Sequence, residues 1–207
     1  QKGQDLVLTA PLVAVPLVRL ITAHAYQAGA ATVTTFYSDE ETTLARYRHG
    51  HDDSFDRAPN WLYDGMAKAY ENGAARLAIA GDNPMLLAQE DPTKVGRANK
   101  ATSIAYKPAL EHISNFDINW NICSYPNPSW AKLVFPDMPI EEAVRKLADA
   151  IFAASRVDRD DPVAAWAEHN AELKKRSTWL NGERFAALHF TGPGTDLTVG
   201  LADGHEW

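Results

Sequence analysis

The sequence has only one cysteine, Cys123, which excludes an internal disulfide bond and a metal cluster held by several thiolates. It also lacks a long basic segment: Lys174-Lys175-Arg176 is the longest basic run, and 20 Lys and Arg residues stand against 27 Asp and Glu residues. A net charge of −7 without a basic patch argues against a nucleic-acid partner. No apolar run reaches the roughly 18 residues that a membrane helix needs, because prolines and an arginine interrupt the segment 6–20. Since no signal segment is recognisable, we expect a protein of the cytoplasm with no membrane partner.

Glycine motifs for nucleotide binding are missing as well. The chain has neither a G-x-G-x-x-G fingerprint nor a Walker sequence containing Gly-Lys-Ser or Gly-Lys-Thr. Gly81-Asp82-Asn83-Pro84 follows a strand-like run, at the place where open α/β sheets bind ligands. A turn that caps the next helix is the preferred interpretation of this segment. A nucleotide-binding oxidoreductase is therefore disfavoured.

Strand-like and helical patterns alternate along most of the chain. Apolar, β-branched runs occupy 6–9, 32–37, 76–80 and 118–124, and helical patterns occupy 16–27, 40–70 and 91–112 between them. Such alternation is typical of βαβ units, whose strands pair in parallel. The sequence therefore predicts an α/β fold with a mainly parallel, Rossmann-like sheet and helices on both faces.

Helix starts are marked by capping residues. Ser38 and Glu41 have the spacing of a capping box. Asn-Pro or Asp-Pro pairs, which offer a capping side chain and then proline at the first helical position, occur at 83–84, 91–92, 127–128 and 161–162. The most regular helix pattern spans 162–180, where Val163, Trp166 and Leu173 fall on one face, and a further helix fits 140–153.

The last part of the chain changes character. Strand-like runs at 185–190 and 195–201 follow each other directly around Gly192-Pro193-Gly194. This change predicts a linker near Asn181-Gly182, with an α/β domain at 1–181 and the start of a second domain at 182–207. Strand patterns also lie close to both ends, and we therefore expect a chain cut from a larger enzyme.

Two candidate reactive groups have simpler structural interpretations. The segment Arg48–Asp53 contains His49, His51, Asp52 and Asp53, but structural zinc sites need four well-placed ligands and catalytic sites need three. An exposed polar turn is the preferred interpretation there. Cys123 could act as a nucleophile only beside a base and with a lowered pKa, so a buried strand cysteine is preferred.

The segment 119–130 is the densest unusual stretch. The fourth predicted strand brings Tyr125, Asn127 and Trp130 to its carboxyl end, where aromatic and amide groups can shape a substrate pocket. Alternatively, the prolines set a turn and the tryptophans fill the core. Near the C-terminus, Asp196 could bind a ligand or metal and His205-Glu206 could transfer protons, although no spacing is diagnostic. The candidate cavity-lining residues are Trp120, Tyr125, Asn127, Trp130, Asp196 and His205, and no catalytic or metal-ligating residue is assigned.

Several of these segments occur in the order seen in one enzyme family. They are Gly3–Leu8, Ala25–Ala30, Tyr37–Asp39, Gly81–Pro84, Asn119-Trp120, Tyr125-Pro126, Trp130–Lys132, Phe135–Asp137, Trp179–Asn181 and Gly194–Thr198. The chain resembles the N-terminal half of the thermophilic-metalloprotease-like aminopeptidases, of the aminopeptidase T and aminopeptidase S kind. The resemblance covers the whole chain, and its specific parts are 120–137 and 194–207.

This resemblance implies an exopeptidase that removes N-terminal residues from peptides with two divalent metal ions, zinc or cobalt. It also implies homodimers that enclose a cavity, and metal ligands that belong to a missing catalytic domain into which the C-terminal strands lead. This chain is then expected to supply scaffold and cavity wall and to be inactive alone. The alternative is a free-standing α/β ligand-binding or interaction module without catalysis. That alternative predicts a stop codon after Trp207, whereas the enzyme hypothesis predicts that the reading frame continues.

Overall fold

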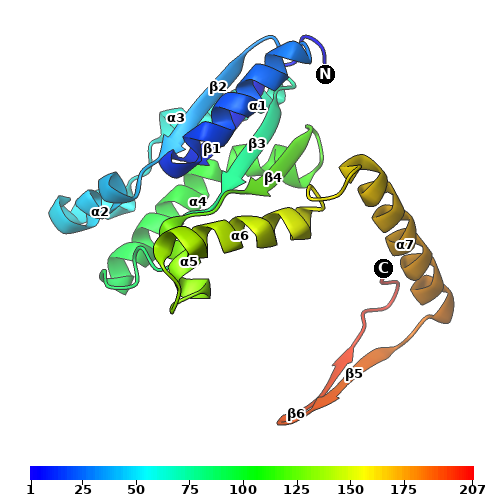
Figure 1. Cartoon of the computed structure of the whole chain (residues 1–207). Helices are drawn as coiled ribbons and strands as arrows, with labels where there is room; N and C mark the ends of the chain where they lie inside the picture. Colours follow the sequence, from blue (N-terminus) through cyan, green and yellow to red (C-terminus); the bar gives the residue numbers. More distant parts are fainter. The chain divides into compact units, whose positions relative to one another are not determined.

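The computed structural model describes all 207 residues and contains a four-stranded parallel sheet flanked by helices, followed in sequence by an antiparallel hairpin (Figure 1). Strands β1 to β6 span Leu6–Pro11, Val33–Ser38, Ala75–Ala80, Trp120–Ser124, Ala187–Gly192 and Thr195–Gly200. Helices α1 to α7 span Val15–Gln27, Glu40–His49, Asn60–Glu71, Pro92–Ser114, Pro128–Val134, Ile140–Ser155 and Pro162–Glu183. Two 3-10 helices, η1 and η2, span Leu12–Ala14 and Asp52–Asp56. None of the helices combines the length and apolar character needed to cross a bilayer.

The chain divides into two compact units, Gln1–Ile151 and Phe152–Trp207. The sequence-based division into domains at 1–181 and 182–207 stays a prediction. The linker expected at Asn181-Gly182 is wrong, because α7 continues through both residues to Glu183. The residue after the helix, Arg184, caps it with a left-handed backbone (φ 51°) and donates its N–H to the Leu180 carbonyl.

The sheet of the first unit has the strand order β2-β1-β3-β4, and every neighbouring pair is parallel. The connection from β1 passes through α1 to β2 at one edge of the sheet. The connection from β3 passes through α4 to β4 at the opposite edge. Because these two connections run in opposite directions, the carboxyl ends of β1 and β3 form a switch point, where open α/β sheets bind ligands. The predicted parallel α/β fold is confirmed.

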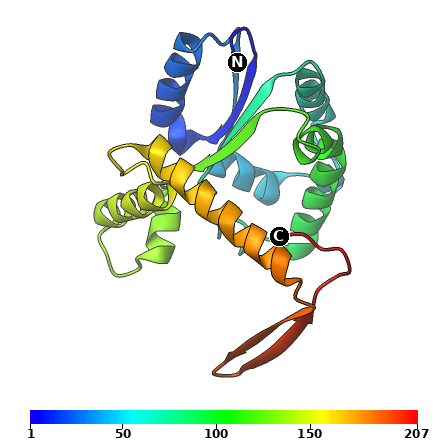
Figure 2. The same ribbon diagram turned by 90° about the vertical axis from the view of Figure 1, so that its right-hand side faces the viewer.

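Alternate residues of the sheet feed two separate cores. Val7 points to one face, where it packs with Met66 of α3 and Ile113 of α4. Its neighbour Leu8 points to the other face, where it packs with Val18 of α1. Figure 2 shows α1 (blue) on one side of the sheet and α3 and α4 (teal and green) on the other. The predicted helices on both faces are therefore confirmed.

Most of the predicted helix starts are present, and one was assigned to the wrong residue. Asp91, Asn127 and Asp161 each cap the helix that begins at the following proline. The capping box at Ser38 is wrong: Asp39 caps α2 and accepts from the Thr42 N–H at 2.8 Å. Ser38 instead ends β2, and its hydroxyl donates to Asp82. The helix start predicted at Asn83-Pro84 is wrong, because turns follow Pro84 and the next helix, α4, begins only at Pro92. The Asn83 side chain accepts from the Met85 N–H at 3.0 Å within this turn.

Candidate functional site

Polar groups from three connections meet at the carboxyl edge of the parallel sheet. Ser38, at the end of β2, donates its hydroxyl hydrogen to Asp82 Oδ1 at 3.2 Å. The carboxylate oxygen Oε1 of Glu40, at the start of α2, accepts from the Asn83 backbone N–H at 3.2 Å and from Asn127 Nδ2 at 2.8 Å. A single carboxylate oxygen therefore ties the loops after β3 and β4 to the first turn of α2.

Asn127 is the buried polar residue of this edge, with only 4% of its surface exposed. Its Oδ1 accepts from the backbone N–H groups of Ser129 (2.7 Å) and Trp130 (3.4 Å), and these bonds cap the start of helix α5. Its Nδ2 donates to Glu40 in the bond described above. Both ends of the amide are therefore used, as burial of a polar group requires.

Gly81 lets the loop after β3 lie directly against the loop after β4. It has φ 147°, which side-chain-bearing residues rarely adopt, and a Cβ atom there would overlap the carbonyl oxygen of Tyr125. The Tyr125 N–H meanwhile donates to the Ala80 carbonyl at 2.8 Å, so the two segments are held together by a backbone hydrogen bond. The close approach of the two loops therefore requires glycine at position 81, and the sequence pattern alone did not indicate this requirement.

A hollow of about 270 Å³ lies beside these contacts. Its walls come from the connections after β1, β2 and β4, and they contain carboxylates, a carboxamide and hydroxyls but no basic side chain. Such a surface favours positively charged groups. The lining residues are Pro11, Leu12, Val13, Ser38, Asp39, Glu40, Glu41, Asn127, Pro128 and Ser129.

Of the residues predicted to line a cavity in this unit, only Asn127 lies at the hollow. Tyr125 is half-buried against the core beneath α1, and Trp130 packs on the small core between α5 and α6. Trp120 begins β4, at the end of the strand opposite Asn127, and its ring lies 6.0 Å from that of Phe116. The structure does not bring these four residues together, and their role as cavity wall stays a prediction.

The two remaining candidates belong to the second unit and have different partners. Asp196 Oδ1 accepts from His189 Nε2 at 2.7 Å on the exposed surface of the hairpin. His205 donates from Nδ1 to the Ala202 carbonyl at 2.9 Å. It lines a hollow of about 550 Å³ together with Arg184 and Glu206. No hydrogen bond links Asp196 to His205.

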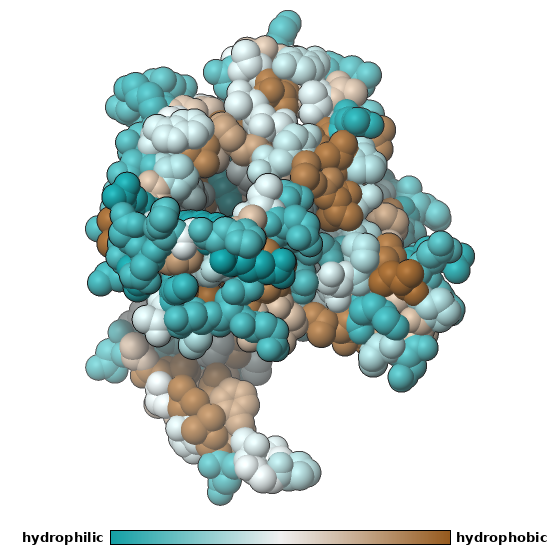
Figure 3. Space-filling view, turned by 90° about the vertical axis from the view of Figure 1, so that its left-hand side faces the viewer, coloured by the Kyte–Doolittle hydropathy of each residue, from teal (hydrophilic) through white to brown (hydrophobic).

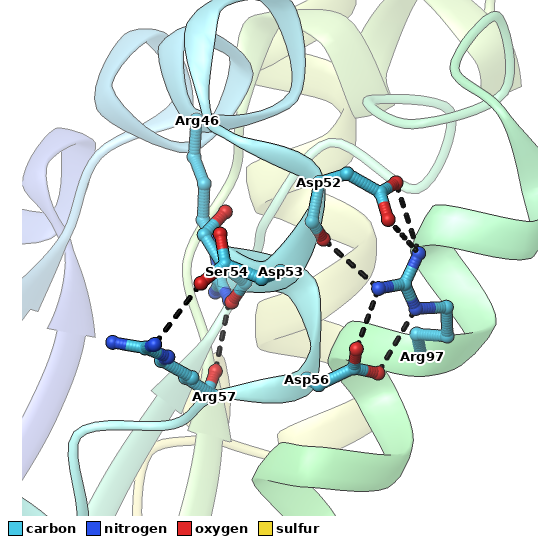
Figure 4. Close-up of polar contacts among 7 residues, drawn as sticks. All are labelled: Arg46, Asp52, Asp53, Ser54, Asp56, Arg57 and Arg97. Carbon is cyan, nitrogen blue, oxygen red and sulfur yellow. Dashed lines mark hydrogen bonds and ion pairs between the residues drawn. The ribbon is translucent and has the colours of Figure 1, made fainter.

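The histidines and acids of 48–53 form an exposed polar turn, as preferred from the sequence. Asp52 and Asp56, from η2, bind Arg97 of α4 (Figure 4). The Arg97 guanidinium reaches both carboxylate oxygens of Asp52 at 3.0 Å and Asp56 Oδ1 at 2.9 Å. Asp53 pairs with Arg57 at 3.0 Å. Spacing gave no signal for Arg97, which lies about 40 residues further along the chain.

The Arg97 contacts predict a measurable pH effect. Hydrogen bonding by Arg97 holds the pKa of Asp56 below its ordinary value of 3.8. A lowered pKa in the folded state stabilises the fold above that ordinary value, and this contribution is lost as the pH falls through the folded-state pKa. In Arg97→Gln we expect the Asp56 pKa to return toward 3.8, and the acid-side loss of stability to become shallower. Carbon-detected NMR titration and urea midpoints measured from pH 2 to 6 test this.

Arg57→Gln is the control for that experiment, because Arg57 pairs with the neighbouring Asp53 and not with Asp56. Its effect on the Asp56 pKa should be small. Equal pKa changes in the two variants would show that the general loss of positive charge, and not the Arg97 contact, governs Asp56.

Cys123 is a half-buried strand residue. Burial raises the pKa of its thiol, which disfavours the thiolate needed for nucleophilic attack. The structural interpretation of this residue is therefore supported.

The donor groups of this chain do not fit a metal centre. No three or more His, Cys, Asp and Glu side chains gather where they could hold one ion. A catalytic zinc ion takes three protein ligands, and a two-metal site takes more. The residues present therefore assign no metal chemistry to either unit.

Comparison with known proteins gives matches that cover the whole of this chain. The profile of the thermophilic metalloprotease (M29) family matches residues 1–207. The chain is 52% identical over 207 residues to aminopeptidase T of Thermus thermophilus and 35% identical over 207 residues to aminopeptidase AmpS of Bacillus subtilis. These matches cover 100% of this chain and 51% and 50% of the two relatives. A solved structure of wild-type AmpT from Thermus thermophilus aligns with a TM-score of 0.93 at 50% identity, over 100% of this chain and 51% of that one.

The chain thus spans about half the length of the curated relatives that it matches. Within that span, agreement extends to the fold as well as the sequence, since the solved relative superimposes over the whole chain. The resemblance inferred from 120–137 and 194–207 is therefore confirmed. The chain belongs to the thermophilic metalloprotease (M29) family, among relatives named as aminopeptidases.

Proposed function

We propose that this chain is the N-terminal part of a metal-dependent aminopeptidase that removes N-terminal residues from peptides, and that it supplies scaffold and cavity wall. The proposal rests on the family match over residues 1–207 of this chain. It also rests on 52% identity to an aminopeptidase T, of which this chain covers 51%. Two divalent metal ions, zinc or cobalt, would serve the whole enzyme by activating water and polarising the scissile carbonyl. We assign their ligands outside this chain, because its own donors do not gather in threes.

The carboxyl edge of the sheet is the part of this chain that we propose to face the substrate cavity. Its hollow has carboxylate walls from Asp39, Glu40 and Glu41, and Asn127 closes one side. A peptide substrate carries a protonated amino terminus, and an acidic wall attracts such a group through the field of its carboxylates. We extend the proposal to the other candidates from the sequence, Trp120, Tyr125, Trp130, Asp196 and His205, as residues that the whole enzyme brings to the cavity.

The resemblance to this family also supports a homodimer, and we include that in the proposal with peptides as substrates. The single cysteine fits a reducing cytoplasm. The proposed second domain begins at 182, so the C-terminal strands form its start and lead into the rest of it.

Activity measurements test whether this chain needs the rest of the enzyme for catalysis. The 207-residue chain, purified and supplied with Zn²⁺ or Co²⁺, is expected to show no turnover of an aminoacyl chromogenic substrate above the rate with metal alone. The same chain continued beyond Trp207 by the unmatched half of Thermus thermophilus aminopeptidase T is expected to hydrolyse it. Full-length aminopeptidase T serves as the positive control. Metal-dependent turnover by the 207-residue chain would contradict the proposal.

A further inference from the structure

The β5–β6 hairpin has one apolar face and one polar face. Leu188 lies opposite Val199 and Phe190 lies opposite Leu197, so these four side chains share a face, which we call the apolar hairpin face. The residues between them alternate to the other face, which is polar and carries His189, Thr191, Asp196 and Thr198.

The apolar hairpin face is exposed within its own unit. Phe190, Leu197 and Val199 keep 49%, 53% and 41% of their surface in contact with solvent. Figure 3 shows apolar side chains, in brown and tan, along the hairpin at the bottom of the view. A two-stranded hairpin is marginally stable in water unless its apolar face packs against a further strand or helix. Helix α7, the other element of this unit, has no buried residue of its own.

We propose that the apolar hairpin face is covered by the half of the M29 length that lies outside the match with this chain. The inference rests on the proposed function, because it requires this chain to be joined to that half. The relatives supply the occupant: their alignments cover this whole chain but only about half of their own length.

The size of the face favours an occupant in the same polypeptide over a second copy. A stable dimer interface buries about 800 Å² on each partner, and four partly exposed side chains provide only a fraction of that area. Separate partners must also offset the loss of translational and rotational freedom. A segment tethered to the same chain is present at a high effective concentration and does not face that cost.

Hydrogen exchange of the hairpin amides tests the proposal. We compare the 207-residue chain with the polypeptide continued by the unmatched half of Thermus thermophilus aminopeptidase T. The amides of 188–199 are expected to exchange about 100-fold or more slowly in the longer polypeptide, because several apolar side chains leave water there. The amides of β1 serve as the folding reference in both. Fast exchange of the β1 amides in the longer polypeptide would mean that this polypeptide does not fold. The measurement is then made on full-length aminopeptidase T, whose corresponding hairpin amides are expected to exchange slowly.

Matched substitutions on the two faces separate packing from general destabilisation. Leu197→Asp, on the apolar face, is expected to restore fast hairpin exchange in the longer polypeptide. Thr198→Asp, on the polar face of the same strand, should keep the slow exchange.

Equal hairpin exchange in the two polypeptides would overturn the proposal, as would slow exchange already present in the 207-residue chain. If that slow exchange depended on protein concentration, a second copy would be the occupant. Turnover is measured separately, so a longer polypeptide that hydrolyses peptides while its hairpin exchanges fast refutes only the docking.

Discussion

Replacing Gly81 with alanine is expected to lower the free energy of unfolding by about 2–4 kcal/mol. Two effects add at this position. The backbone has φ 147°, which alanine adopts only with strain, and the new Cβ would overlap the carbonyl oxygen of Tyr125. The overlapping atom is backbone held by the Tyr125 N–H bond to Ala80, so it cannot move aside cheaply. Urea unfolding followed by circular dichroism measures the loss.

Two other glycines of the same compact unit provide the controls. Gly73 has φ 84° but no neighbour within 4 Å of a built Cβ, so Gly73→Ala tests backbone strain alone and should cost about 1–2 kcal/mol. Gly96 lies inside helix α4 with open space around it, so Gly96→Ala should stabilise by about 0.5–1 kcal/mol. If Gly81→Ala were no more harmful than Gly73→Ala, the close approach of the loops after β3 and β4 would be wrong.

Asn127→Ala is expected to cost about 2–4 kcal/mol, because it removes a helix cap and leaves a carboxylate without its partner. The buried amide of Asn127 starts α5 through Ser129 and holds Glu40 through Nδ2 at 2.8 Å. Without the amide, Glu40 keeps only the 3.2 Å bond from the Asn83 N–H. The loop after β4 should then separate from the first turn of α2 at the hollow. Urea unfolding measures the energy, and hydrogen exchange of the first turn of α5 locates the change.

Asp91→Ala is the matched control, because Asp91 caps α4 at the protein surface and its side-chain hydrogen bond is to its own helix. Loss of that cap should cost about 1 kcal/mol. A double-mutant cycle of Asn127→Ala with Glu40→Ala isolates the bond between the two side chains. Equal losses in Asn127→Ala and Asp91→Ala, with no coupling to Glu40, would show that the cap is the whole role of Asn127.

The sequence predicted the regular elements well because their signals are local. Each of the four parallel strands was predicted from a short apolar, β-branched run, and Asp91, Asn127 and Asp161 were predicted as caps from the proline that follows each one. Two of the local errors share a cause. Ser38 was taken as a cap and Asn181-Gly182 as a linker, but capping and glycine signals leave an uncertainty of a few residues in where an element ends. The structure moved each boundary by one or two residues.

By itself, the sequence determined the α/β fold, the parallel sheet, the strand pair at the end and membership of the M29 family. These depend on hydrophobic period, capping residues and ordered motifs, which are written along the chain. Only the tertiary structure decided which side chains share a site. Glu40 meets Asn127 across 87 positions, Arg97 meets Asp56 across 41, and Gly81 touches Tyr125. Such contacts depend on strand order and loop path, and a single sequence carries no local signal for either. The tertiary structure also separated Trp120 from the other residues of its segment, because the length of β4 lies between Trp120 and the carboxyl edge where Asn127 is buried.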